Sequence, residues 1–313
     1  MYVTRALRLI LHPIASVCLL WCASALSAEP LHTGSEGLLL KYHEIEADLL
    51  KNHFCIPIHV ESFEEDNSLQ GDAYGIIEHP FNDLRSMLQV PATWCDIAVV
   101  HFNIKACTYR KLKNKWLLTF YSGRKFYQPP QDTYQLKYDY RIIEQQPEYL
   151  KISLTADHGP LKTKDYRIDL EAMPLEEGST FVHFSYAYSY GSLARMAMKG
   201  YFATLGRGKF GFSVVNTDSQ GSPVYASGTR GVIERNAVRY YFAIQAYMDT
   251  LKFPEEKRFE KRVSQWYDLT DQHQKQLLEM SKEEYLKYKK LERANQLMLQ
   301  RQLGQYHSGE VVQ

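Results

Sequence analysis

The segment that most constrains this chain is the long amphipathic stretch from Gly228 to Leu251. Its apolar residues recur at steps of four and three, which places them on one face of a helix. These residues are Ile233, Ala237, Tyr240, Ile244, Tyr247 and Leu251. Charged residues such as Glu234, Arg235 and Arg239 take other positions, so the helix is expected to have a polar back. Its apolar face must be buried against another element.

The segments upstream alternate with period two and supply that element. The clearest runs from Thr133 to Glu144, where Tyr138 and Tyr140 alternate with charged neighbours. Such alternation is typical of an antiparallel strand with one buried face. Similar short segments continue to Tyr190 with turn residues between them, which predicts an antiparallel meander.

Further elements are expected before the meander. A first helix is predicted from Gly34 to Asn52, and two strands follow it. Pro80 suits the start of a short helix, and Pro91 breaks it. A second short helix or turn then carries Trp94.

This order of elements resembles the helix-grip fold of the START-like (SRPBCC) superfamily. The resemblance is carried by GDAYGIIEHPFNDLRSML (71–88), PATWCDIAVV (91–100), the strands to Tyr190, and RNAVRYYFAIQAYMDTL (235–251). It predicts an α+β fold over residues 34–252, in which a curved antiparallel sheet grips the long helix, with an insertion at 192–228. It also implies a deep apolar cavity between sheet and helix, whose usual contents are lipids, sterols, polyketides or other hydrophobic molecules.

The composition agrees with a pocket lined by rings, since the chain has 23 Tyr, many at alternating positions. For any single tyrosine, filling of the core is the simpler explanation. The candidate ligand-binding residues are Trp94, Tyr138, Tyr140, Ile233, Arg235, Ala237, Tyr240, Ile244 and Tyr247. Arg235 and Arg239 stand one turn apart and could either hold an anionic head group at the cavity mouth or pair with strand carboxylates.

The sequence gives little support for nucleotide binding, metal binding or serine-hydrolase chemistry. The sequence GRGKFG (206–211) matches a dinucleotide-binding glycine pattern but precedes a β-type segment, so a loop is expected there. Histidines are scattered without metal-ligand spacing, and no GxSxG motif occurs. No catalytic residue, metal or cofactor is predicted. The formal net charge of +1 gives no reason to expect nucleic acid as a partner.

The N-terminus is typical of a signal peptide over residues 1–28. Arg5 and Arg8 precede an apolar run that ends in small residues, and cleavage is expected near Ala28. The mature protein is therefore expected in the periplasm or secreted. An uncleaved anchor is the alternative, although the apolar run is short. Cys95 and Cys107 are the preferred disulfide pair in such a compartment, against the alternative of three buried thiols that include Cys55.

After Pro254 the composition shifts to charged residues, and residues 254–313 are predicted to form a helical extension. Ser281 and Glu284 form a capping box within it. The extension could lie on its own domain, or residues 254–303 could bind a protein partner. Three function hypotheses follow: binding or transport of a hydrophobic molecule or lipid with transient membrane-surface contact, a cyclase or hydrolase of the same fold, and an interaction protein that works through the C-terminal helices.

Overall fold

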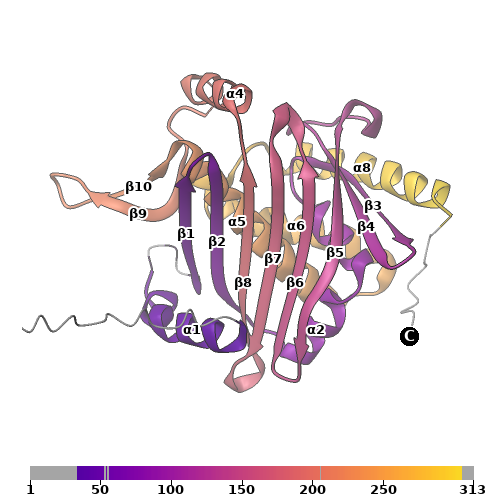
Figure 1. Cartoon of the computed structure of the whole chain (residues 1–313), viewed down its shortest axis with the longest axis horizontal. Helices are drawn as coiled ribbons and strands as arrows, with labels where there is room; N and C mark the ends of the chain where they lie inside the picture. Colours follow the sequence, from indigo (N-terminus) through magenta and orange to yellow (C-terminus); the bar gives the residue numbers. More distant parts are fainter. Residues whose placement is uncertain (1–33, 53, 55, 205, 305–313) are drawn as a thin grey trace, which may run out of the picture. The chain divides into compact units, whose positions relative to one another are not determined.

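The computed structural model describes residues 34–52, 54, 56–204 and 206–304. Within these residues, eight antiparallel strands form the main sheet in the order β1-β2-β8-β7-β6-β5-β4-β3 (Figure 1). The predicted leader, Cys55 and the last residues lie outside the described residues. The strands are β1 (Ile58–Glu65), β2 (Ser68–Ile77), β3 (Ile104–Leu112), β4 (Lys115–Ser122), β5 (Tyr134–Gln146), β6 (Tyr149–His158), β7 (Lys164–Pro174) and β8 (Thr180–Ser189).

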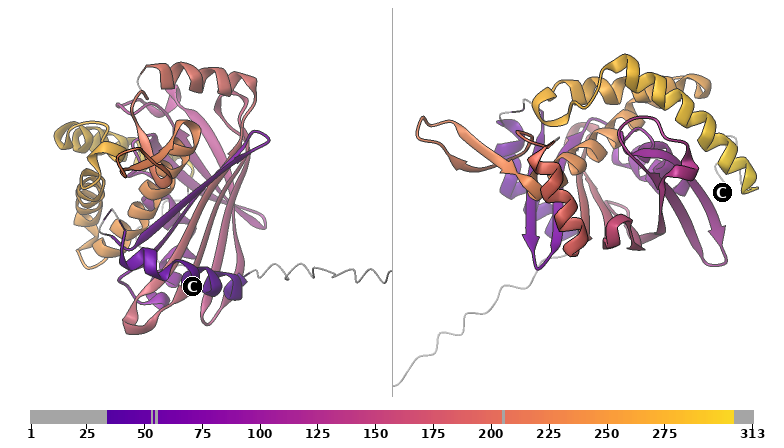
Figure 2. Two further views of the ribbon diagram at one scale, coloured as in Figure 1. Left: turned by 90° about the vertical axis from the view of Figure 1, so that its left-hand side faces the viewer. Right: turned by 90° about the horizontal axis from the view of Figure 1, so that it is seen from above.

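Helices cover both faces of the sheet. Helix α1 packs on the outer face, where its Leu38 and Ile45 meet Tyr149 and Phe181. Helices α5, α6 and α8 lie on the other side (Figure 2). The helices are α1 (Gly34–Leu50), α2 (Phe81–Leu88), α3 (Pro91–Ala98), α4 (Ser192–Ala203), α5 (Gly228–Thr250), α6 (Glu255–Asp271), α7 (Gln274–Leu277) and α8 (Lys282–Gln302), with short 3₁₀ turns η1 (Pro130–Asp132), η2 (Pro160–Lys162) and η3 (Glu176–Gly178). The predicted α+β architecture, a sheet gripping a long helix, is confirmed.

Two glycines of β2 let α5 approach the sheet closely. A Cβ atom at Gly71 would lie 3.0 Å from the backbone of Ile233, and one at Gly75 would lie 2.4 Å from the Tyr241 hydroxyl. That hydroxyl donates to the carbonyl of Ile76 (2.9 Å). A larger residue at Gly75 would therefore push the helix away from the sheet.

The face of α5 that meets the sheet differs in part from the prediction. Tyr241 contacts β2, whereas Tyr247 lies beside α3 and α6, with its hydroxyl 3.2 Å from Thr93 Oγ1 and the Arg262 guanidinium 4.2 Å from its ring centre. The expectation of a solvent-facing polar back is wrong. Glu234, Arg235 and Arg239 are 0%, 3% and 5% exposed, because β9, α6 and α7 pack on that side of the helix.

The insertion at 192–228 consists of α4 and a hairpin of β9 (Phe210–Thr217) and β10 (Pro223–Ser227). The glycine pattern forms the turn before β9 and opens no helix, as the sequence predicted. Beyond the hairpin, Glu234 of α5 accepts hydrogen bonds from the backbone N–H groups of Phe212 (2.6 Å) and Ser213 (3.0 Å). The hairpin therefore supplies the hydrogen bonds that this buried carboxylate needs.

The C-terminal extension lies on its own domain. Helix α8 runs beside the edge strand β3, where Gln300 Oε1 accepts from the Tyr109 N–H and Nε2 donates to the Tyr109 carbonyl, both at 2.9 Å. Buried Lys105 of β3 pairs with Glu292 of α8 (2.8 Å). The helix thus covers a strand edge that would otherwise expose unpaired backbone groups. A protein partner for residues 254–303 stays a prediction.

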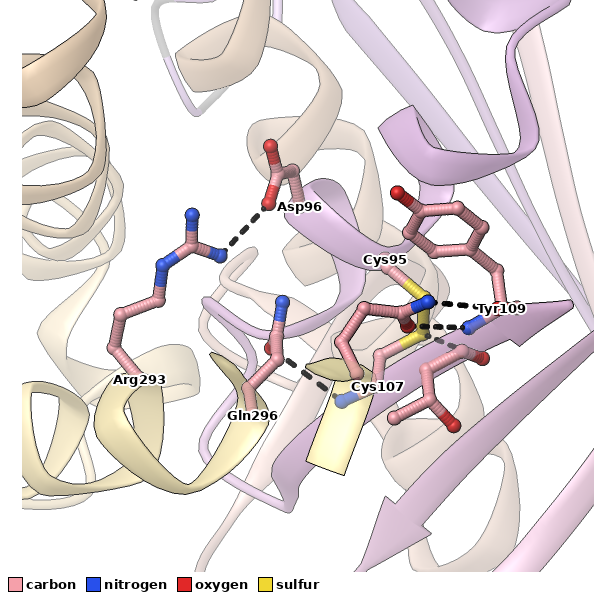
Figure 3. The surroundings of a disulfide bond; sticks show 8 residues. Cys95, Asp96, Cys107, Tyr109, Arg293 and Gln296 are labelled. Carbon is pink, nitrogen blue, oxygen red and sulfur yellow. Dashed lines mark hydrogen bonds and ion pairs between the residues drawn. A yellow bond between two sulfur atoms is a disulfide. The ribbon is translucent and has the colours of Figure 1, made fainter. Parts of the chain in front are cut away.

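A disulfide joins Cys95 of α3 to Cys107 of β3, with the two Cα atoms 5.0 Å apart (Figure 3). The predicted pair is confirmed. Next to it the Cys107 N–H donates to Gln296 Oε1 of α8 (3.4 Å), and Arg293 pairs with Asp96 (3.0 Å). One covalent bond therefore holds together the region where α3, β3 and α8 meet.

Replacing both Cys95 and Cys107 by Ala is expected to lower the free energy of unfolding by about 3 kcal/mol, because the bond closes a short loop in the unfolded chain. Denaturant unfolding of the oxidised protein measures this loss. Addition of a reductant should reproduce it in the wild type and change nothing in the variant. A loss below about 0.5 kcal/mol would show that the bond contributes no stability.

Candidate functional site

A cluster of tyrosines occupies the space between the sheet and α5. Alternation along β8 turns Tyr186 and Tyr188 to the inner face, where they meet rings from β7 and α5. The Tyr166 and Tyr188 rings stack with centres 5.2 Å apart, and the centres of Tyr186 and Tyr240 lie 6.0 Å apart. Tyr138 of β5 lies next to this group and packs on Phe120 (4.9 Å).

Tyr186 and Tyr188 are only half-buried although they pack on the main core. The same two rings also contact a smaller apolar cluster that includes Ala194 and Met198 of α4. Helix α4 lies at the end of the sheet where β8 finishes (Figures 1 and 2). The two rings therefore lie at the end of the sheet near α4.

Two hollows open at this end. One, of about 570 Å³, is lined by residues of the β1–β2 turn together with Tyr190, Met198 and Phe202. The other, of about 490 Å³, lies at the β6–β7 turn beside Thr163, whose Oγ1 is 2.8 Å from the Tyr166 hydroxyl. Helix α4 contacts η2 in that turn. Helix α4 thus lies next to both hollows.

The ionisable groups inside this region are held neutral. Burial raises the pKa of the Tyr138 and Tyr186 hydroxyls well above their usual range and that of Tyr166 to about 12. His101 stacks on Tyr240 with ring centres 5.1 Å apart. Burial lowers the pKa of His101 well below its usual range, and Arg239 and Lys289 add to this effect. The cluster therefore offers neutral hydrogen-bonding groups on an aromatic surface.

The structure brings together only some of the predicted ligand-binding residues. Tyr138 and Tyr240 belong to the tyrosine cluster. Trp94 Nε1 and the Tyr140 hydroxyl both donate to the carbonyl of Leu88 (2.8 and 3.1 Å), so their polar atoms are satisfied within the protein. The aliphatic candidates of α5, which are fully buried in the packed core, are Ile233, Ala237 and Ile244. A ligand contact at any of these residues stays a prediction.

Sequence reasoning missed Tyr166, Tyr186 and Tyr188 as site residues. Their strands were predicted, and the alternation that turns these rings inward was visible in the sequence. The missing information was which strands lie beside α5. That depends on the pairing of β2 with β8, which joins residues more than 100 positions apart in sequence, such as Ile77 and Thr180.

A second group of side chains, the cationic cluster, surrounds Glu279 in the loop between α7 and α8. Arg239 (2.8 Å) and Lys209 (2.6 Å) pair with Glu279, and Lys125 also contacts it. Arg235 lies one turn before Arg239 and donates to the carbonyl of Phe210 (3.1 Å). The pairing predicted for these arginines is thus realised for Arg239, with a carboxylate from a loop rather than from a strand.

Glu279 is expected to be important for stability, because it is the carboxylate shared by several buried cations. Nearby cations, Arg239 first and then Lys125, outweigh the opposing effect of burial and lower the pKa of Glu279 to about 2. Replacement by Gln should cost about 3–5 kcal/mol at neutral pH, since it leaves buried charges uncompensated. Denaturant unfolding at pH 7 measures this cost.

The pH dependence of this cost has a defined sign. A carboxyl whose folded pKa is lowered stabilises the protein above its unfolded pKa, near 4.5, and loses that contribution as the pH falls through about 2. The difference between wild type and Glu279→Gln should therefore shrink as the pH falls through this window. The exposed Glu283→Gln is a matched control and should stay within about 0.5 kcal/mol of wild type. An equally small effect at Glu279 would contradict the assignment.

Comparison with known proteins returned structural neighbours only. No protein-family model matches the sequence, and no curated protein matches it. A conserved protein of unknown function from Enterococcus faecalis is 10% identical, covers 71% of this chain and 92% of its own, and has a TM-score of 0.34. Human StAR-related lipid transfer protein 5 is 7% identical, covers 53% and 87%, and has a TM-score of 0.31.

Norcoclaurine synthase from Thalictrum flavum is 9% identical, covers 62% of this chain and 88% of its own, and has a TM-score of 0.31. At these identities and TM-scores the likeness concerns the fold and transfers no function.

Among the described residues, no helix has the length and apolar character needed to cross a bilayer.

Proposed function

We propose that this protein binds a hydrophobic small molecule or lipid in the space between its sheet and α5. The observation that supports this most directly is the incomplete burial of Tyr186 and Tyr188 inside the tyrosine cluster. Aromatic surface with a few hydroxyl groups is the usual lining of a pocket for an apolar ligand. The hollows beside α4 suit an entrance at this end of the sheet.

A binding role is favoured over acid–base catalysis. The ionisable groups described in this region are tyrosines with raised pKa values and His101 with a lowered one. Each is therefore neutral around pH 7, whereas a general acid or base works best with a pKa near the working pH. The protein is further proposed to act after export, with the Cys95–Cys107 disulfide suited to an oxidising compartment.

Helix α4 is proposed as the contact with a membrane surface during uptake or release. Leu193 and Met196 are 42% and 66% exposed, and Arg195 and Lys199 stand beside them. Apolar side chains flanked by basic ones are typical of helices that lie on an anionic bilayer. This role would place the entrance of the binding space at the lipid surface.

The proposed binding space can be tested by a substitution that fills it with a larger side chain. Ala156 lies on the inner face of β6 beside Tyr166 and is buried. Ala156→Trp is expected to weaken binding of Nile red, a neutral apolar probe, by about tenfold, with less than about 1 kcal/mol change in the free energy of unfolding. Fluorescence titration and denaturant unfolding provide the two measurements.

A matched control is available on β8. Ala187 lies on the opposite face of the sheet from Tyr186 and Tyr188, so Ala187→Trp should leave Nile red binding unchanged. If Ala156→Trp instead lowers stability by about 1–3 kcal/mol and the probe binds as before, the tyrosines fill a packed core and the proposal fails. Mass spectrometry of a solvent extract from the purified protein would identify the natural ligand.

A further inference from the structure

The cationic cluster contains more basic side chains than the carboxylate that pairs with them can neutralise. Its basic members are Arg235, Arg239, Lys125 and Lys209, and the carboxylate that they share is Glu279. Burial lowers the pKa of Arg239, Lys125 and Lys209, although Glu279 acts in the opposite direction on each of them. An excess of buried cations is unfavourable unless an anion joins them.

Arg235 is the member with the least compensation. Its side chain is buried, with 3% of its surface exposed, and it donates a hydrogen bond to the backbone carbonyl of Phe210. Burial, together with the neighbouring Arg239, lowers the pKa of Arg235 to about 10. Within the part of the chain that the structure describes, the buried Nε atoms of Arg235 and Arg239 have no hydrogen-bond partner. The two guanidinium groups thus retain donors that a bound anion could use.

The neighbouring Glu234 adds negative charge near Arg235, but other donors already occupy its carboxylate oxygens. Its carboxylate accepts from the N–H groups of Phe212 and Ser213 and from the hydroxyl of Ser62 (2.5 Å). These donors satisfy Glu234 from strands β1 and β9. Arg235 therefore differs from its chain neighbour, because one is fully partnered within the protein and the other is not.

The cluster is reachable from the surface and borders the proposed binding space. The Lys125 and Lys209 side chains are 35% and 21% exposed and form its outer part. The Lys125 ammonium lies 5.8 Å from the ring centre of Tyr201 on α4. On the inner side, Arg239 precedes Tyr240 of the tyrosine cluster and lies near His101, which stacks on that tyrosine. Helix α4 thus borders both the tyrosines and the cations.

We propose that Arg235 and Arg239, with Lys125 and Lys209 at the rim, bind the carboxylate or phosphate head group of an anionic amphiphile. This inference rests on the proposed function, because the apolar body of the same ligand would lie among the tyrosines. Guanidinium groups suit this task, since their forked donors match planar and tetrahedral oxyanions. The selected ligand class is an anionic lipid or fatty acid rather than a neutral sterol or alcohol.

The test compares ligands that differ only in the head group. Dodecanoate and dodecanol share one apolar body, and inorganic phosphate supplies an oxyanion without a body. We expect the wild type to bind dodecanoate at least about tenfold more tightly than dodecanol in calorimetric titrations. Arg235→Met should abolish this difference and leave dodecanol binding unchanged. Its free energy of unfolding should stay the same or rise, because an uncompensated buried charge is removed.

Arg141→Gln is the matched control, since Arg141 is exposed on β5 and its replacement changes the net charge equally. It should keep the preference for dodecanoate. Equal binding of dodecanoate and dodecanol by the wild type would overturn the anion site and leave the proposed function intact. If neither amphiphile binds, but Arg235→Met weakens phosphate binding, the site takes free anions and the proposed function fails. If phosphate too is bound equally by both proteins, the anion site is overturned as well.

Discussion

The close packing of α5 against β2 is the contact on which the rest of the structure depends. Gly71 and Gly75 have no side chains that would keep the helix at a distance from the sheet. The Tyr241 hydroxyl can therefore donate to the backbone carbonyl of Ile76. The opposite side of α5 is buried as well, because β9, α6 and α7 pack on it. The insertion and the C-terminal helices cover that side, so both additions are part of the core of this protein rather than attachments to it.

Because α5 is enclosed, its polar groups are buried and need hydrogen-bond partners from other segments. Trp266 of α6 donates to the carbonyl of Arg239 (2.9 Å), and the β9 backbone donates to Glu234. These contacts satisfy buried polar groups, as a stable interior requires. Arg235 and Arg239 are exceptions on the same helix, because the buried Nε atom of each has no hydrogen-bond partner among the described residues. The proposed anionic head group would supply the acceptor that these two groups lack.

Much of the fold could be predicted from periodicity, and the site could be predicted only in part. Alternation identified the inward rings of β5, and Tyr138, a candidate ligand-binding residue from the sequence, lies beside the tyrosines of β7 and β8. The same rule did not select Tyr186, because the neighbours of β8 were unknown. On α5, Glu234 and Arg235 were placed toward solvent because charged residues usually are. Their hydrogen-bond partners, the backbone groups of Phe212 and Phe210, lie in β9, which no local pattern links to α5.

The sequence by itself determined the identity of the main elements and the inner faces of the strands. Periods of 3.6 and 2 arise from the geometry of a single helix or strand, so they can be recognised without knowledge of neighbours. The tertiary structure decided which faces are enclosed, which tyrosines meet, and which buried arginine nitrogens of the described residues lack a hydrogen-bond partner. These properties depend on the pairing of β2 with β8 and on the covering of α5 by distant segments, where long-range packing sets the local environment of each charge.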